Sequence, residues 1–148
     1  MLTVNVVNSS EVQSLLTRLL GRLGDLQPAM ESIGMTMEAR VSGRFETERD
    51  PLGHPWAPWA PSTVESYPKG GNRRILDRYG DMLGSLNSQA DATSVRIGFG
   101  NPVATYHEWG TEHMPRRGLL MADPDAGTLA PDDEVAVLEI LQVFLESP

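Results

Sequence analysis

The sequence predicts an α+β domain in which a small antiparallel sheet packs against a long helix and a C-terminal helix. Ile33, Met37, Val41 and Phe45 repeat at steps of four, which indicates a long helix with one buried face. Two short segments flank a polar turn at 91–93, and in the second of them Val95, Ile97 and Phe99 alternate with polar residues or glycine, which indicates an antiparallel hairpin. Strands and helices do not alternate regularly along the chain, so the pattern disfavours a βαβ fold.

Length and composition set the outer limits of the prediction. A chain of 148 residues is long enough for a real hydrophobic core, and we expect one domain over residues 1–148. The absence of cysteine excludes disulfides, thiolate nucleophiles and Cys-based metal sites. The first residues lack the basic leader of a signal peptide, and no apolar run approaches the roughly 18 residues of a membrane helix. We therefore expect no membrane partner.

The formal charge of −8 is unevenly distributed. Ten of the twelve basic residues lie between Arg40 and Arg117, whereas seven acids and no basic residue follow Arg117. Because nucleic-acid binding depends mainly on neutralising phosphates, so acidic a chain is not expected to grip DNA. The pattern favours contact with a basic partner or between oppositely charged faces of like subunits. Alternatively, the acids only keep the protein soluble.

The first part of the chain predicts a strand and two helices. Leu2–Val7 alternates as a strand does. Ser10–Gly24 is predicted to be helical, with its first residue and Gln13 forming a capping box. The second helix, Pro28–Arg49, places a proline in its first turn, where the missing N–H costs nothing. Its polar face is expected to carry Glu31, Glu38, Arg40, Arg44 and Glu48.

Asp50–Pro61 is predicted to be an extended loop, because its four prolines fix φ and remove hydrogen-bond donors. The loop carries Trp56 and Trp59. Full exposure of two tryptophans would be costly, so they either pack onto the domain or are held ready for a partner. The sequence leaves both alternatives open.

The elements after this loop are short and are separated by glycine or polar residues. In order, we expect a helical turn at Pro61–Tyr67, an amphipathic helix at Ile75–Leu86, strands at Leu86–Ala90 and Ser94–Gly100, a short helix at Pro102–Trp109 and a return to the sheet at Met114–Met121.

The C-terminal helix is predicted to begin at Pro131, since proline and acids such as Asp132 and Asp133 are favoured in a first turn. It runs to about Glu146. Its apolar arc is wide. The helix is therefore either covered on two sides within the monomer or meets a neighbouring chain.

The histidines invite a metal hypothesis, because His107-Glu108 resembles the start of a metalloprotease motif. The next histidine, His113, follows at i+6, whereas the zinc motif requires i+4 on one helical face. We therefore interpret His107 as a packing or hydrogen-bonding residue. No nucleophile elbow, phosphate loop or singled-out pair of carboxylates occurs, so the residues predict no catalytic site and no cofactor.

Five segments of the central chain occur in the order of a known phage pattern. They are Phe45 with Gly53–Thr63, Ile75-Leu76 with Gly80–Leu86, Val95–Gly98, Ala104–Gly110, and Met114–Leu120. From Phe45 to Asp123 the chain resembles the phage virion morphogenesis family, which groups the G-like protein of phage Mu with the tail completion protein S of phage P2. Tyr79, Trp109 and Gly118 depart from that pattern.

The resemblance implies a structural virion protein with a tail-terminator or connector-like fold, not an enzyme. Its role would be to complete the tail or join head to tail, as a homo-oligomeric ring (a hexamer, for example) around the DNA channel. Its partners would be like copies and neighbouring neck and tail proteins, in the virion and, during assembly, in the host cytoplasm. DNA would only pass through, and a lumen lined by Arg40, Arg73 and Arg74 would contradict this.

We expect the tryptophan loop and the segment 107–117 to be the contact surfaces. The candidate interface residues are Trp56, Trp59, His107, Trp109, Pro115, Arg116 and Arg117. Two alternatives belong to other classes. One is a small metal-dependent hydrolase that uses His54, His107 and His113. The other is a monomeric, host-directed phage regulator.

Overall fold

A computed structural model describes residues 2–5, 10–23 and 25–146 of the chain. Val6, Val7 and Gly24, which the sequence assigns to element ends, lie outside the described residues. In chain order the elements are β1 (Leu2–Asn5), α1 (Ser10–Leu23), α2 (Gln27–Thr47), α3 (Pro61–Ser66), α4 (Asp81–Gly84), β2 (Leu86–Ala90), β3 (Val95–Phe99), α5 (Val103–Trp109) and α6 (Pro131–Glu146).

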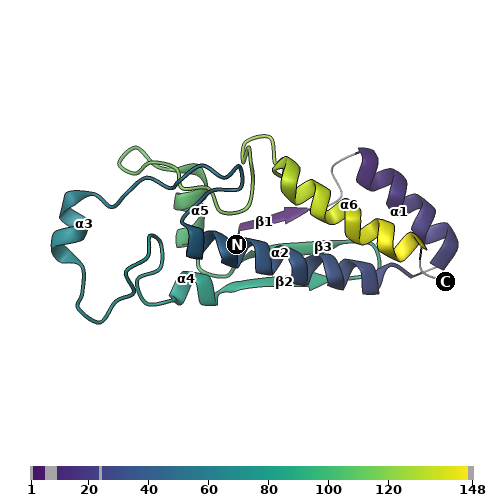
Figure 1. Cartoon of the computed structure of the whole chain (residues 1–148), viewed down its shortest axis with the longest axis horizontal. Helices are drawn as coiled ribbons and strands as arrows, with labels where there is room; N and C mark the ends of the chain where they lie inside the picture. Colours follow the sequence, from purple (N-terminus) through teal and green to yellow (C-terminus); the bar gives the residue numbers. More distant parts are fainter. Residues whose placement is uncertain (1, 6–9, 24, 147–148) are drawn as a thin grey trace.

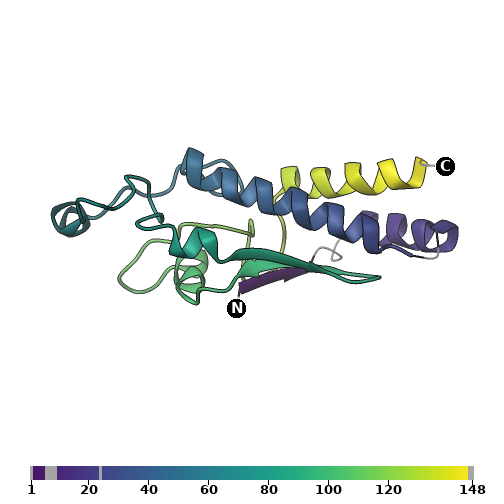
Figure 2. The ribbon, with the colours of Figure 1, turned by 90° about the horizontal axis from the view of Figure 1, so that it is seen from below.

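The molecule is elongated and has two layers over most of its length (Figures 1 and 2). Helices α1, α2 and α6 form one layer, and the sheet lies beneath α2 (Figure 2). A lobe that contains α3 projects from one end of the long axis, and α1 lies at the other (Figure 1). The predicted α+β class, with an antiparallel sheet against a long helix and a C-terminal helix, is confirmed.

The described sheet has three antiparallel strands in the order β1-β3-β2. Leu2 of β1 and Leu86 of β2 both lie opposite Phe99 of β3. The turn between β2 and β3 is organised by Asp91, whose carboxylate accepts backbone N–H groups of the turn. These hydrogen bonds lower the pKa of Asp91 below its usual value. The central strand β3 is largely buried, whereas β2 is only partly buried.

The predicted apolar stripe of α2 forms the centre of the core. Ile33, Met37, Val41 and Phe45 are all buried, as the step of four predicts. Gly34 on the same face lets α2 approach β2 closely, since a Cβ there would lie 2.6 Å from the Ser88 Oγ. The close packing of α2 on the sheet therefore depends on Gly34, a position that the hydrophobic repeat of the helix does not predict.

Arg44 corrects the predicted polar face of α2, because this arginine is buried. One guanidinium nitrogen donates to the carboxylate of Asp133 on α6, and another donates to the Leu119 carbonyl at 2.7 Å. Arg40 binds the other carboxylate oxygen of Asp133 at 2.8 Å. The carboxylate, which has no exposed surface, is therefore bound by two arginines, and the cluster joins α6 to α2.

The predicted helix at Ile75–Leu86 is wrong for its first half. Residues 74–77 instead form a tight turn in which Arg74 donates to the Asp77 carboxylate. Leu76 there has a φ of 63°, in the left-handed region that leucine rarely adopts. Only α4 is helical, and it begins after Gly80, whose φ is 84°. Before Gly80, hydrogen bonds from the Arg74 side chain to the Asp77 carboxylate stabilise a turn in place of the backbone hydrogen bonds of a helix.

The predicted return of Met114–Met121 to the sheet is also wrong. The residues form no strand, and the backbone N–H groups of Leu119, Leu120 and Met121 bind a side chain instead of a neighbouring strand. Helix α6 packs against both α1 and α2, so it is covered on two sides within the monomer, and its contact with a neighbouring chain stays a prediction. Val135 on its outer face remains 50% exposed.

Replacing Asp133 by alanine should strongly destabilise the protein. The change leaves the buried Arg44 without its partner charge, and such losses cost about 3–5 kcal/mol of unfolding free energy. Urea denaturation followed by circular dichroism measures it. Asp132→Ala is the matched control, because Asp132 is exposed in the same helical turn and should have little effect. Equal effects of the two changes would contradict the role of the cluster.

Candidate interaction surface

The candidate surface is built on Glu108, near the end of α5. Its side chain has no exposed surface. One carboxylate oxygen accepts the N–H groups of Leu119 and Leu120 at 2.6 and 3.0 Å, and the other accepts the N–H of Met121 at 3.0 Å. Three successive backbone donors thereby satisfy one buried anion. The carboxylate fixes the segment 117–121 against α5.

Arg116 completes the return of the chain onto α5. Its Nε donates to the Glu108 carbonyl at 2.6 Å, and a terminal nitrogen donates to the Met121 carbonyl at 2.6 Å. The return needs Gly110, which has a φ of 74° and whose added Cβ would lie 2.9 Å from the Arg116 backbone nitrogen. Arg116 thus links the end of α5 to Met121 through hydrogen bonds within the monomer.

Two of the predicted interface residues, Trp56 and Arg117, attach the tryptophan loop (50–61) to the segment 117–121. The Trp56 indole donates to the Gly118 carbonyl at 2.9 Å and meets Phe45 edge to face, with ring centroids 5.4 Å apart. Arg117 donates to the carbonyls of Ala57 and Pro58. Trp56 and Arg117 are 5% and 9% exposed, so in the monomer both are internal residues at the root of the loop. For Trp56, packing onto the domain is the alternative that the structure shows.

Residues 59–79, which we call the arm, form the projecting lobe of Figure 1. Trp59 stacks on Tyr67 with ring centroids 4.5 Å apart. The guanidinium groups of Arg73 and Arg78 each lie 5.3 Å from the Tyr67 ring centroid. Aromatic and cation–π contacts therefore order the part of the arm around Tyr67, whereas Ile75 and Leu76 at its C-terminal end pack against the hydrophobic core.

A cleft of about 430 Å³ lies where the arm meets α5 and the segment 113–117. His107 and His113 both line it, together with Tyr67, Arg78 and Arg117. The His107 Nδ1 and the Tyr67 hydroxyl are buried atoms without a hydrogen-bond partner among the described residues. Burial, and then the charge of Arg117, lower the pKa of His107. The cleft thus favours a neutral imidazole.

Several residues of the segment 107–117 are accessible on the surface. Trp109 is 41% exposed, and its indole donates to the Asp125 carboxylate at 3.1 Å. Pro115 and His113 are exposed as well. Trp109, Pro115 and the half-buried Trp59 remain available for contact, and their interface role stays a prediction.

The histidines do not assemble a metal site. His54 is exposed in a different loop, 3.7 Å from the Asp50 carboxylate, and does not line the cleft. Within residues 2–5, 10–23 and 25–146, no group of three or more His, Asp or Glu side chains is placed to hold a metal ion. The site lacks the ligand set that hydrolysis at a metal centre requires.

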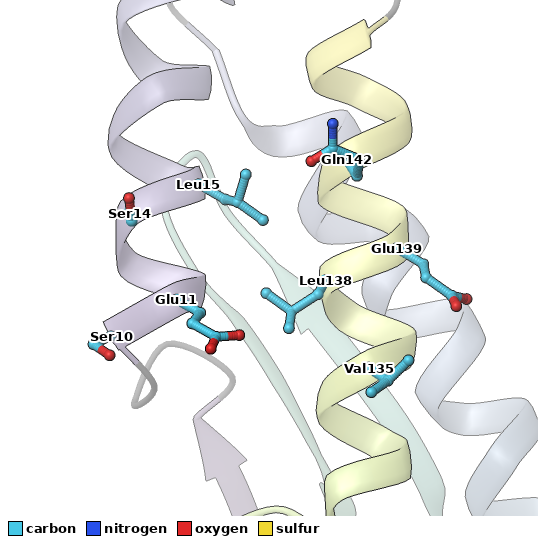
Figure 3. Close-up of a pocket in the computed structure, with 8 residues that line it drawn as sticks. All are labelled: Ser10, Glu11, Ser14, Leu15, Val135, Leu138, Glu139 and Gln142. Atoms are coloured by element: carbon cyan, nitrogen blue, oxygen red, sulfur yellow. The ribbon is translucent and has the colours of Figure 1, made fainter.

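A second hollow lies on the opposite half of the molecule, between α1 and α6 (Figure 3). This groove, of about 530 Å³, has Leu15 and Leu138 pointing toward each other across it (Figure 3). Its remaining lining residues are Ser10, Glu11, Ser14, Val135, Glu139 and Gln142. The groove therefore has an apolar floor, an acidic margin and no basic residue.

Comparison with known families decides the class of the protein. Residues 7–146 match the phage virion morphogenesis family. The chain belongs to this family. The match extends well beyond the central stretch that carries the resemblance in the sequence, and it includes α1, α2 and α6.

A curated relative supports the same assignment. The chain is 24% identical over 146 residues to the Mu-like prophage FluMu G protein 2 of Haemophilus influenzae. The aligned region covers 99% of this chain and 97% of that protein. No solved structure gives a significant match. Membership of the family gives the chain a structural role in phage virion morphogenesis. None of the described helices is both long enough and apolar enough to cross a bilayer.

Sequence reasoning missed Glu108 and the arm cations. The sequence draws attention to Glu108 only as the neighbour of His107 in a possible metal motif. One indication of its internal role is its spacing of four residues from Ala104, which places the two on one face of the predicted helix, and Ala104 is buried. Arg73 and Arg78 gave no signal, because their contact with Tyr67 depends on the fold of the arm.

Glu108→Gln should destabilise the protein by about 2–4 kcal/mol, because an amide retains one acceptor and leaves buried N–H groups without a partner. Hydrogen exchange of the Leu119–Met121 amides should accelerate in parallel. Glu112→Gln, at an exposed position, is the control and should leave both quantities unchanged. Unaltered exchange in the Glu108 variant would show that another acceptor holds the segment.

Stability should fall on acidification because of His107. Its pKa in the folded state lies below its usual value of about 6.5, so the unfolded chain binds the proton first. Unfolding free energy should therefore decrease as pH drops through about 6.5, until the lowered pKa is reached. Urea midpoints between about pH 7.5 and about pH 5 measure this slope. His107→Gln should flatten the slope, whereas His54→Gln should not.

Proposed function

We propose that the protein is a tail completion or head–tail joining component that acts by ring-type self-assembly around the DNA channel. The observation that carries the proposal is the family match over residues 7–146. The relative covers nearly the whole chain as well, so the proposal applies to the chain as one unit. Its place of action would be the neck or tail of the virion, with neighbouring phage neck and tail proteins as further partners.

The shape of the molecule supports assembly. It is elongated, with the arm at one end and the groove between α1 and α6 toward the other (Figures 1 and 3). Exposed large apolar residues remain on both parts, including Val64 and Tyr79 on the arm and Val135 on α6.

The charges support passage of DNA without tight binding. Two of the three arginines that would contradict an acidic lumen are held in ion pairs, since Arg40 binds Asp133 and Arg74 binds Asp77. A net charge of −8 also disfavours tight binding of the chain to phosphates.

The alternatives have less support. The hydrolase hypothesis requires His54, His107 and His113 to converge, and only the last two line one cleft. The regulator hypothesis predicts a monomer that is absent from virions. The family match favours a virion morphogenesis role over both.

Purified protein should form closed oligomers of defined copy number. Light scattering over a concentration series gives the mass, and negative-stain images of the same fractions show the shape. Trp109→Ala should keep the fold and weaken assembly, because Trp109 is exposed. Trp56→Ala is the contrasting variant, and its cost should be about 3–5 kcal/mol of stability. A persistent monomer that is also absent from purified virions would overturn the proposal in favour of the regulator.

A further inference from the structure

We propose that the arm of one copy docks in the groove between α1 and α6 of a second copy. The inference rests on the proposed self-assembly and names the two surfaces that meet. Each surface keeps exposed apolar side chains in the monomer, and the two surfaces are opposite in charge.

The groove offers an apolar floor that the monomer leaves open. Leu15 and Leu138 face each other across it, and both are only partly buried (Figure 3). Val135 at one side is 50% exposed. An apolar floor between two helices is suited to receive apolar side chains of another element.

The arm offers such side chains on a projecting, ordered scaffold. Val64 on α3 is 54% exposed and Tyr79 is 60% exposed. Because Trp59, Tyr67 and the two arginines already order the arm, docking loses less conformational entropy than docking of a flexible loop.

Charge identifies a second copy as the occupant. The arm carries four basic and two acidic residues, and its Arg73 and Arg78 form no ion pair among the described residues. The groove is lined by Glu11 and Glu139, which have no ion pair within the described chain either, and by no basic residue. Helix α6 carries five acids and no base. Opposite charges on the two surfaces favour the arm–groove approach and disfavour groove–groove contact.

The contact joins unlike surfaces, which fixes the kinds of assembly that it can build. Because arm and groove lie on opposite halves of a long molecule, a head-to-tail contact repeats from copy to copy and closes as a ring when the rotation permits. Two copies that exchange arms reciprocally would instead form a closed dimer. The measured mass separates these outcomes.

Charge reversal tests the contact. Arg73→Glu with Arg78→Glu reverses the arm, and Glu11→Arg with Glu139→Arg reverses the groove. All four side chains are exposed, so the body of each variant should stay folded by circular dichroism. The arm variant also loses two cation–π contacts to Tyr67, so rescue in the mixture described below is the result that separates lost charge from lost order of the arm. Each pair alone should raise the concentration of half-assembly by about tenfold or more. An equal mixture of the two variants should assemble, because each arm then meets a groove of opposite charge.

A disulfide cross-link provides an independent readout, because the chain contains no cysteine. Val64→Cys combined with Ser14→Cys should give intermolecular disulfides under mild oxidation. Thr93→Cys with Ser14→Cys is the control, since Thr93 is exposed on the β2–β3 turn, and it should give none.

The outcomes separate the inference from the function on which it rests. Rescue in the mixture, together with the specific cross-link, supports the inference. Wild-type oligomers that tolerate both reversals would overturn it and leave self-assembly intact. A wild-type chain that stays monomeric overturns self-assembly and this contact together. A reciprocal dimer keeps the contact and contradicts the ring.

Discussion

One buried carboxylate organises the middle of the molecule. Glu108 has no exposed surface, yet three successive backbone N–H groups of the segment 117–121 bind it. That segment in turn presents carbonyls to Arg44 of α2 and to the indole of Trp56. Helix α2, helix α5 and the root of the tryptophan loop therefore meet on a stretch of irregular chain. Without the carboxylate those donors would be buried and unpaired, which costs more than a lost surface hydrogen bond.

The polar contacts divide the molecule into a body and an arm. In the body, Asp133 joins α6 to Arg40 and Arg44 of α2. A buried ion cluster adds little net stability over apolar packing, so its contribution is to specify how α6 sits on α2. At the boundary, Arg117 holds two carbonyls of the loop. The arm thus leaves the body from a fixed point, while its own tip depends on the stacking of Trp59 with Tyr67.

The sequence predicts the elements whose pattern is local. The stripe of α2, the alternation of β3 and the acids that open α6 each lie within one element, and all three predictions are confirmed. Burial of Arg44 escapes such reasoning, because its partner Asp133 lies 89 residues away in the chain. The strand predicted at Met114–Met121 fails for a similar reason, since its donors bind a side chain of α5. Of the candidate site, the sequence predicts the segments and gives packing of Trp56 onto the domain as one of two alternatives, but it does not predict the internal role of Arg117.

The acidity of the chain has most meaning as a difference between its two ends. A uniformly acidic surface would repel like copies in every orientation, whereas a basic arm and an acidic α6 make one orientation attractive. At about 0.1 M salt, charges act over about 10 Å, so this selection operates as copies come into contact. In a ring built by that contact, the arm cations would be covered by the acids of the next copy. Those arm cations would then be engaged in assembly and would not be available to the phosphates of DNA inside such a ring.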